Sequence, residues 1–379
     1  MASVGIIAEY NPFHNGHLYH LKKIKEMYKD DTVILVLSGN FTERGDVSII
    51  DKWKKTEIAL KAGIDLVIEL PFPFATQSAD YFSYGAITIL EKLKVERLVF
   101  GSESDNLEDI KLIAKEQINN PEFEKLVKVY SKLGENYPTA LSKALKDLTN
   151  KSIKDPNDLL AISYIKTIIE NNYNIEPISI KRTNSYHDKS IDNKISSATA
   201  IRDALKNKKD VKKTVPSFVI PYLKDLHFID NYFKYIKYKI ITEDDLSIYH
   251  GVDEGLDKLL KKEIINSNSY DEFLNNVKTK RYTYNKLTRT ILHILCNFTK
   301  EKAKSFRNID YIRILGFNDK GRKYLNSVKK DLDVELISKI NRDKPDMLEY
   351  ELETTKVYAL GNDDFSLVEK EYKKIVKEK

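Results

Sequence analysis

The fold is decided by residues 4–28, VGIIAEYNPFHNGHLYHLKKIKEMY, where an apolar run passes through a polar turn into a helical pattern. Residues 4–8 are apolar almost throughout, which is typical of a parallel strand covered by helices on both faces. After the turn, Leu18, Leu21 and Ile24 recur at the spacing of one helix face. The stretch therefore predicts a strand, a turn and a helix in direct succession.

The same pattern continues through the first half of the chain. Further apolar runs are found at residues 32–37 (TVILVL), 65–70 (DLVIEL), 97–100 (RLVF) and 177–181 (PISIK), with helical stretches near 52–61 and 78–92. A repeat of roughly 30 residues matches βαβ crossover units. We therefore expect an α/β fold, a Rossmann-like doubly wound parallel sheet whose active site lies beyond the carboxyl ends of its strands.

Composition limits the class of protein. The 379 residues are enough for two or three domains, and 41% hydrophobic with 32% charged residues is typical of a soluble globular chain. No apolar run approaches the roughly 20 residues of a membrane-spanning helix, and no secretory leader is recognisable. The single cysteine, Cys296, excludes an internal disulfide. We expect a cytoplasmic protein.

Positive charge is concentrated in the second half. Residues 281–330 carry 13 Lys and Arg against 3 Asp and Glu. Such a window is expected of a polyanion site, since phosphate contacts dominate nucleic-acid affinity, but a lysine-rich solvated surface explains it equally well. The character of the chain changes near residues 205–220, so we expect a catalytic domain over 1–210 and a mainly α-helical, basic domain over 211–379.

The turn after the first strand carries three of the seven histidines, His14, His17 and His20. Pro12 ends the strand, and Gly16 allows close approach of a ligand. Imidazoles at the mouth of a helix can donate to phosphate oxygens and stabilise a phosphoryl-centred transition state. Two other interpretations are open: a metal site built on the histidines with Glu9, and simple capping and packing.

This turn resembles the His-x-Gly-His signature of the nucleotidyltransferase superfamily, which transfers a nucleotidyl group from an NTP and releases pyrophosphate. Residues 195–202, ISSATAIR, resemble its second motif, with Ala198 in place of a usual serine. The resemblance implies that Ser197, Thr199 and Arg202 hold the β- and γ-phosphates, with Arg202 as a clamp. Alone, the same residues would be an ordinary helix N-cap.

Further stretches are similar to one branch, the tRNA(Met) cytidine acetate ligases. They are residues 4–20, 38–41, 44–46, 52–53, 65–71, 100–103, 156–160, 185–188, 281–284 and 313–324. Lys55 stands where that family would have arginine. The resemblance spans nearly the whole chain. It implies that acetate and ATP give acetyl-adenylate and pyrophosphate, and that the acetyl group passes to N4 of the wobble cytidine of elongator tRNA(Met), giving N4-acetylcytidine.

The resemblance also implies site residues. His14 and His17 would be catalytic. The ATP site would comprise Ile7, Ala8, Glu9, Tyr10, Asn11, Pro12, Phe13, His14, Asn15, Gly16, His17, Leu18, Tyr19, His20, Gly101, Asn157 and Arg182. The basic window would then contact tRNA through Arg281, Tyr282, Tyr284, Lys286, Arg289, Arg313, Arg322 and Lys323. Mg²⁺ would accompany ATP, with Asp46, Glu103 and Asp105 as candidate ligands.

Two other functions remain open at this point. One is an adenylyltransferase for a small phosphorylated metabolite, which would give no reason for a large basic second half. The other is a non-catalytic RNA-binding protein with a vestigial nucleotidyltransferase fold, against which the intact histidine motif counts.

Overall fold

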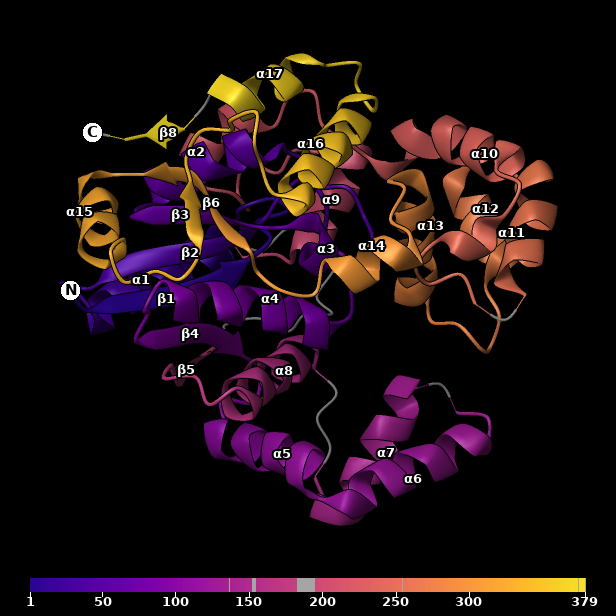
Figure 1. Cartoon of the computed structure of the whole chain (residues 1–379), viewed down its shortest axis with the longest axis horizontal. Coiled ribbons are helices and arrows are strands. Elements are labelled where there is room, and N and C mark those ends of the chain that lie inside the picture. The colour runs from indigo at the N-terminus through magenta and orange to yellow at the C-terminus, as the bar shows by residue number, and fades with distance from the viewer. Residues whose placement is uncertain (136, 152–154, 183–194, 254, 374, 379) are drawn as a thin grey trace.

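A computed structural model describes residues 1–135, 137–151, 155–182, 195–253, 255–373 and 375–378. One mixed sheet forms its centre, in the order β5-β4-β1-β2-β3-β6-β7, with β8 paired to β6 (Figure 1). The strands are β1 (Ser3–Ala8), β2 (Thr32–Ser38), β3 (Leu66–Leu70), β4 (Arg97–Ser102), β5 (Glu176–Lys181), β6 (Tyr311–Phe317), β7 (Glu335–Ile337) and β8 (Val376–Lys377).

The first five strands are parallel, and their pairing confirms the predicted doubly wound sheet. β1 lies between β2 and β4, with Val4 opposite Val33 on one side and Arg97 on the other. The carboxyl ends of β1, β2, β3, β4 and β5 therefore share one edge of the sheet. This edge is the one where an α/β sheet places its ligand.

The second half of the chain extends the same sheet. β6 runs antiparallel to β3, with Phe317 opposite Leu66, and β7 and β8 both pair with β6 in parallel. The basic residues in and around Tyr311–Phe317 conceal this strand in the sequence, although its apolar positions are buried. The predicted domain boundary at residue 210 stays a prediction. Residues beyond it supply β6, β7 and β8 to the same sheet as the first five strands.

Helices cover both faces of the sheet. The helices are α1 (Asn15–Met27), α2 (Lys52–Ala62), α3 (Phe72–Ala75), α4 (Ala79–Lys92), α5 (Leu107–Asn119), α6 (Pro121–Lys132), α7 (Tyr137–Thr149), α8 (Pro156–Glu170), α9 (Ala198–Lys206), α10 (Phe233–Thr242), α11 (Leu256–Ile265), α12 (Tyr270–Val277), α13 (Tyr284–Leu295), α14 (Lys300–Ser305), α15 (Asp319–Val328), α16 (Asp346–Ala359) and α17 (Ser366–Lys373). Short 3₁₀ turns span Ser217–Tyr222, Ile229–Tyr232 and Leu246–Ile248. One buried cluster joins the sheet to α1, α2 and α9, and another joins it to α4 and α8.

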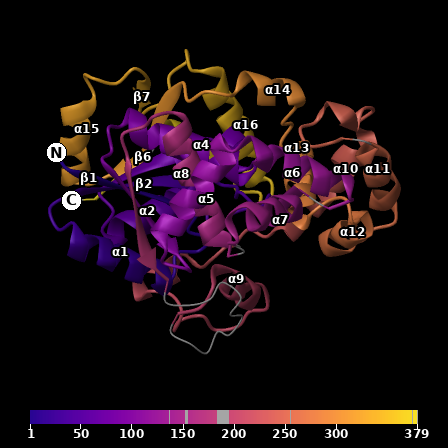
Figure 2. The same ribbon diagram turned by 90° about the horizontal axis from the view of Figure 1, so that it is seen from below.

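Two helical groups extend from this centre. The helices α10, α11, α12 and α13 lie to the right of the sheet in Figure 1, and α5, α6 and α7 lie below it, while Figure 2 shows both groups from below. The right-hand group shares its core with Phe41 and Phe72 of the first half and with Tyr350 and Tyr358 of α16. Within the described residues, no helix combines the length and apolarity needed to cross a bilayer.

Candidate nucleotide and RNA site

Helix α1 begins at a reciprocal cap built from two histidines. His14 is the N-cap, and its Nδ1 accepts the N–H of Gly16 at 3.0 Å. In return, Nδ1 of His17 accepts the N–H of His14 at 3.2 Å. This is the capping-box arrangement, made here with imidazoles instead of a hydroxyl and a carboxylate. The two rings stack with centroids 3.7 Å apart, and a Cβ on Gly16 would come within 2.9 Å of the His14 ring, so glycine is required there.

The cap fixes the protonation pattern of both rings. Burial, with a smaller contribution from Arg182 and Arg202, lowers the pKa of His14 to about 3. Burial also lowers the pKa of His17 well below its ordinary value, with contributions from His14 and Arg182. Both imidazoles are therefore neutral at pH 7. Because each Nδ1 accepts a hydrogen bond, each proton sits on Nε2, which makes both Nε2 atoms donors.

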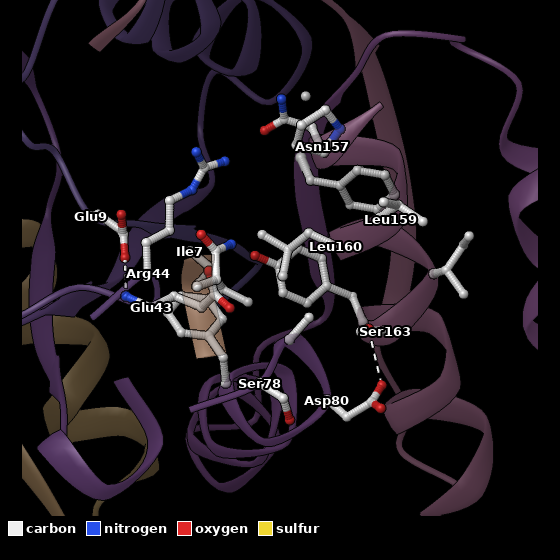
Figure 3. Close-up of a pocket in the computed structure, with 18 of the residues that line it drawn as sticks. Ile7, Glu9, Glu43, Arg44, Ser78, Asp80, Asn157, Leu159, Leu160 and Ser163 are labelled. Atoms are coloured by element: carbon white, nitrogen blue, oxygen red, sulfur yellow. Dashed lines mark hydrogen bonds between the residues drawn. The ribbon is translucent and has the colours of Figure 1, made fainter. Parts of the chain in front are cut away.

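A large cavity opens at this cap, with a volume of about 1670 Å³. It extends along the carboxyl ends of β1, β4 and β5 to the start of α9 and to α13. Figure 3 shows Glu9, Glu43 and Arg44 on one side of it, and Asn157 with Leu159 and Leu160 on the other. The cavity thus lies beyond the carboxyl ends of the strands, where an α/β sheet places its ligand.

Most residues of the predicted ATP site line this cavity. They are Ile7, Ala8, Glu9, Tyr10, Asn11, His14, Gly16, His17, Tyr19, His20, Gly101, Asn157, Arg182, Ser197, Thr199 and Arg202. Four others lie behind the wall: Pro12 and Phe13 are buried, Leu18 packs against a core cluster, and Asn15 donates its Nδ2 to Lys213 O at 2.8 Å. None of these four is part of the cavity lining, and their contact with ATP stays a prediction.

Arg182 and Asn157 meet at an acidic residue, Glu103, that was expected only as a magnesium ligand. Asn157 donates to Glu103, and the Arg182 Nε lies 3.6 Å from the same carboxylate. The side chain of Arg182 also packs over Gly101, where an added Cβ would lie 3.2 Å from its Cγ. Asp158 is buried and holds the loop after β4 by accepting the N–H groups of Glu103 and Ser104 at 3.1 and 3.0 Å. The sequence gives little indication of this role, because an acidic residue in the first turn of a helix, such as Asp158 in α8, is common.

Helix α9 is tied directly to the histidine turn. Ser197 caps it by accepting the N–H of Ala200 at 3.2 Å. Arg202 donates to Asn11 O at 2.8 Å and to Thr199 Oγ1 at 3.2 Å. The structure thus brings both predicted motifs together at one cavity. The phosphate clamp of Arg202 stays a prediction, because its guanidinium here bridges the two motifs.

Lys55 and the loop after β2 complete the wall. The buried Nζ of Lys55 donates to Glu9 O, Ser38 O and Gly39 O at 3.0, 2.7 and 2.6 Å. Its three donors fit three converging carbonyls, which explains an ammonium group at this position. Burial lowers the pKa of Lys55 to about 7, yet three carbonyl acceptors require an N–H on each bond, so we assign the charged form.

The first part of the basic window faces the cavity. Thr283, Asn285 and Arg289 line it. Tyr284 is exposed, Tyr282 is half-buried, and Lys286 forms an ion pair with Asp253 at 3.4 Å. Arg281 is exposed on the approach to α13.

The second part of the basic window lies elsewhere. Arg313 is 0% exposed, within a buried cluster in which Lys52 pairs with Glu69 at 2.6 Å and with Glu371 at 2.7 Å. Arg313 donates to Glu371 O at 2.7 Å. A guanidinium enclosed in this way cannot reach an RNA phosphate, so the prediction that Arg313 contacts tRNA is wrong. Its place on a buried strand is the reason.

Arg322 and Lys323 are exposed but lie on the far edge of the sheet. They belong to α15, whose preceding Asn318 bonds to Asp65 O at 3.0 Å, just before β3. Lys320 of the same helix donates to Asp31 O, just before β2. These contacts place α15 at the amino ends of the parallel strands, opposite the cavity. The predicted tRNA contacts of Arg322 and Lys323 therefore do not share a surface with those around α13.

Metal ligation by the histidine run finds no support in this geometry. The described residues contain no group of three or more His, Cys, Asp or Glu side chains placed to hold an ion. His14 and His17 use Nδ1 for capping, as the packing interpretation expected, while Nε2 remains available for a ligand. Of the expected magnesium ligands, Asp46 lines the cavity. The family stretch at residues 185–188 lies outside the described residues.

A doubly wound sheet with a histidine-capped first helix and a second capped helix at one cavity defines a nucleotidyltransferase-type protein. Residues 1–373 match the family described as HIGH Nucleotidyl Transferase. A tRNA(Met) cytidine acetate ligase of Geobacillus sp. (strain WCH70) is 40% identical over 95% of this chain and 94% of its own length. The chain belongs to the HIGH nucleotidyl transferase family and, within it, to the tRNA(Met) cytidine acetate ligases.

Solved structures are similar over the whole chain. The apo crystal structure of Thermotoga maritima TmcAL (form I) has a TM-score of 0.92, with 30% identity over 100% of this chain and 99% of that one. The crystal structure of Thermotoga maritima TmcAL bound with alpha-thio ATP has a TM-score of 0.90, also with 30% identity over 100% of this chain and 99% of that one.

Proposed function

We propose that this protein is an ATP-dependent ligase that activates acetate and transfers the acetyl group to N4 of the wobble cytidine of elongator tRNA(Met), forming N4-acetylcytidine. Relatives of this chain are named tRNA(Met) cytidine acetate ligase, and one similar solved structure is bound with alpha-thio ATP. The observation that carries the proposal is the pair of neutral imidazoles, His14 and His17, each with its Nε2 donor available at the mouth of α1. We place this activity in the cytoplasm.

In the first step an acetate oxygen attacks the α-phosphorus of ATP, and the bond from that phosphorus to the bridging oxygen breaks. Acetyl-adenylate forms and pyrophosphate leaves. Donors already aimed at the reacting phosphate stabilise the extra negative charge without reorganising. The Nε2 atoms of His14 and His17 supply such donors, and the charge of Arg182 lies close enough to lower the pKa of both rings.

In the second step the N4 amine attacks the acetyl carbonyl carbon. The bond from that carbon to the adenylate oxygen breaks, AMP leaves, and N4 loses one proton. No acyl-enzyme nucleophile is needed. Cys296 is consistent with this, because it is buried and burial raises the pKa of its thiol.

Mg²⁺ would accompany the triphosphate and neutralise part of its charge. Such an ion commonly keeps several waters and takes only one or two carboxylates from protein. Glu9 and Asp46 line the cavity and fit that limited role. Glu103 is engaged by Asn157 and fits it less well.

The size of the cavity favours this function over an adenylyltransferase for a small metabolite. Pockets for small molecules commonly have volumes of about 300 to 1,000 Å³, whereas this cavity has about 1670 Å³ and reaches α13. Part of its lining comes from Thr283, Asn285 and Arg289 at the start of α13, where an unstacked anticodon base and its phosphates would be held. Arg281, Tyr282, Tyr284, Lys286 and Arg289 are the proposed tRNA-facing residues.

A paired substitution at His17 tests the phosphate role. In His17→Asn the amide oxygen can take the place of Nδ1 and keep the cap, but the Nε2 donor is removed. Acetate-dependent ATP–pyrophosphate exchange should fall by about 100- to 1,000-fold, as for loss of one transition-state donor. His17→Gln places an amide N–H near the Nε2 position and should retain more activity.

Thermal unfolding and tRNA binding serve as the controls, and both should stay close to wild type in His17→Asn. Equal exchange rates in the wild-type protein and His17→Asn would refute the assignment. A wild-type protein that leaves the wobble cytidine (C34) unmodified when given labelled acetate, ATP and tRNA would refute the function itself.

A further inference from the structure

One ion pair crosses the cavity wall between the two halves of the chain. Nη1 of Arg289, on α13, lies 2.6 Å from Oε1 of Glu43, in the loop after β2. Both side chains are mostly buried, with 17% and 21% exposed, and both line the cavity that holds the histidine cap.

The backbone holds this pair at a fixed place relative to the nucleotide site. The N–H of Glu43 donates to Oε1 of Glu9 at 2.7 Å, and Glu9 directly follows β1 (Figure 3). Gly45 in the same loop has φ +76°, and an added Cβ would lie 2.2 Å from the backbone nitrogen of Arg289. The loop and α13 are therefore in backbone contact, and the pair cannot shift without moving both.

The pair leaves polar atoms facing the cavity. The three hydrogen bonds of Arg289 all leave from Nη1, to the Glu43 carboxylate, Glu43 O and Gln77 O. Within the part of the chain that the structure describes, Nη2 and Nε of Arg289 and Oε2 of Glu43 have no hydrogen-bond partner. These two cavity-lining side chains thus keep one acceptor and two donors that the described residues do not use.

One acceptor followed by two donors complements the base-pairing edge of cytosine and opposes that of uracil. Cytosine presents an N4 amine donor followed by the N3 and O2 acceptors, and carboxylates are the usual partners of the N4 amine. Uracil presents O4, an acceptor, at the first position and an N3–H donor at the second. A carboxylate facing O4 would leave two acceptors opposed, which is costly in a buried site.

We propose that Glu43 and Arg289 form the recognition pair for the wobble cytosine, Glu43 accepting from its N4 amine and Arg289 donating to N3 and O2. This assignment rests on the proposed function, because it requires the acceptor base to enter this cavity. Glu43 thereby selects the base that carries an amine to acetylate, and it rejects uracil before any acetyl-adenylate is consumed.

The test compares two tRNA(Met) transcripts that differ only in C34 or U34, in the presence of ATP. We expect wild-type protein to bind the C34 transcript at least about tenfold more tightly, the usual scale for one well-formed base contact. Glu43→Gln keeps the size of the side chain but can donate to O4. It should reduce the C34-to-U34 affinity ratio by about tenfold.

Glu243→Gln is the matched control. Glu243 has 22% of its side chain exposed and pairs with Lys239 at 2.7 Å, but it lies outside the cavity lining. It should leave the affinity ratio unchanged.

Three outcomes would overturn the assignment. The first is an unchanged C34-to-U34 affinity ratio in Glu43→Gln, and the second is equal binding of both transcripts by the wild-type protein. The third is a loss of exchange and thermal stability in Glu43→Gln with equal effects on both transcripts, which would mean that the ion pair only holds the loop and α13 together. Failure of the wild-type protein to acetylate C34 at all would instead refute the proposed function, so the two failures are distinguishable.

Discussion

The two parts of the basic window, residues 281–289 and 313–323, look alike in the sequence but have different surroundings in the fold. In the first part, Arg289 lines the cavity and Arg281 is exposed on the approach to α13. In the second part, Arg313 is enclosed in the core, and Arg322 pairs with Asp319 on the far edge of the sheet. A high local density of positive charge in the sequence therefore predicts a polyanion site. Only the topology shows which of the basic residues lie on the surface near the cavity.

The largest expected effect tests the buried cation. Arg313→Met should reduce the free energy of unfolding by roughly 3 to 5 kcal/mol, the usual cost of removing one partner from a buried charge cluster. Burial, together with the charge of Glu69, already raises the pKa of Glu351 to about 8, so the cluster tolerates little further negative charge. Urea unfolding measures the change. Arg322→Met, at an exposed site, should change it by less than about 0.5 kcal/mol.

The contrast would fail if Arg313→Met were as stable as the wild-type protein and instead weakened tRNA binding. That result would place Arg313 on an RNA-binding surface and require β6 to leave the sheet.

The second effect compares the exposed cations directly. The double variant Arg281→Ala with Lys286→Ala should bind tRNA about 10- to 100-fold less tightly and lower the slope of log affinity against log salt by about two, one for each phosphate that is no longer neutralised. Arg322→Ala with Lys323→Ala removes the same charge from the far edge and should change neither quantity. Filter binding over a salt series measures both.

Equal reductions in affinity in the two double variants would show that total charge, and not its position, determines the affinity. The proposed separation of the two parts would then be wrong.

The smallest effect concerns the loss of stability at acid pH. This loss should depend on the buried histidines of the cavity and not on the cations of residues 281–289 or 313–323. An unfolded His14 takes up a proton below its ordinary pKa of 6.5, whereas the folded protein resists this down to about 3. Stability should therefore fall on acidification from pH 6.5, by up to about 1.4 kcal/mol per pH unit for each such histidine. His14→Asn keeps a good N-cap and removes this titration, so its stability should fall less steeply between pH 6.5 and 5.

Urea unfolding at several pH values measures these slopes, and the Arg322 and Lys323 double variant should follow the wild-type curve. An unchanged slope in His14→Asn would show that other groups account for the acid sensitivity.

Much of the fold was predictable because its signals are local. The expected strand at residues 4–8 is observed as Ser3–Ala8, and the helix expected near 78–92 is observed as Ala79–Lys92. The histidine turn was equally readable, since His14, Gly16 and His17 act within one turn of chain.

The missed features depend on distant partners. β6 belongs to the sheet only because it pairs with β3, which lies more than 200 residues earlier in the chain. Glu43 resembles any charged surface residue until α13 brings Arg289 against it. No pattern within either segment carries that information, so the sequence predicted Arg289 as a tRNA contact but not its pairing with Glu43.

The continuity of the cavity from the histidine cap to α13 has a consequence for product yield. A mixed anhydride of acetate and AMP is destroyed by water, and an intermediate released between two separate sites would be hydrolysed in proportion to its time in solution. If the acetyl-adenylate forms and reacts in this one cavity, as proposed, it is not released between the two steps and spends less time exposed to water. ATP consumption per modified tRNA should then remain close to one.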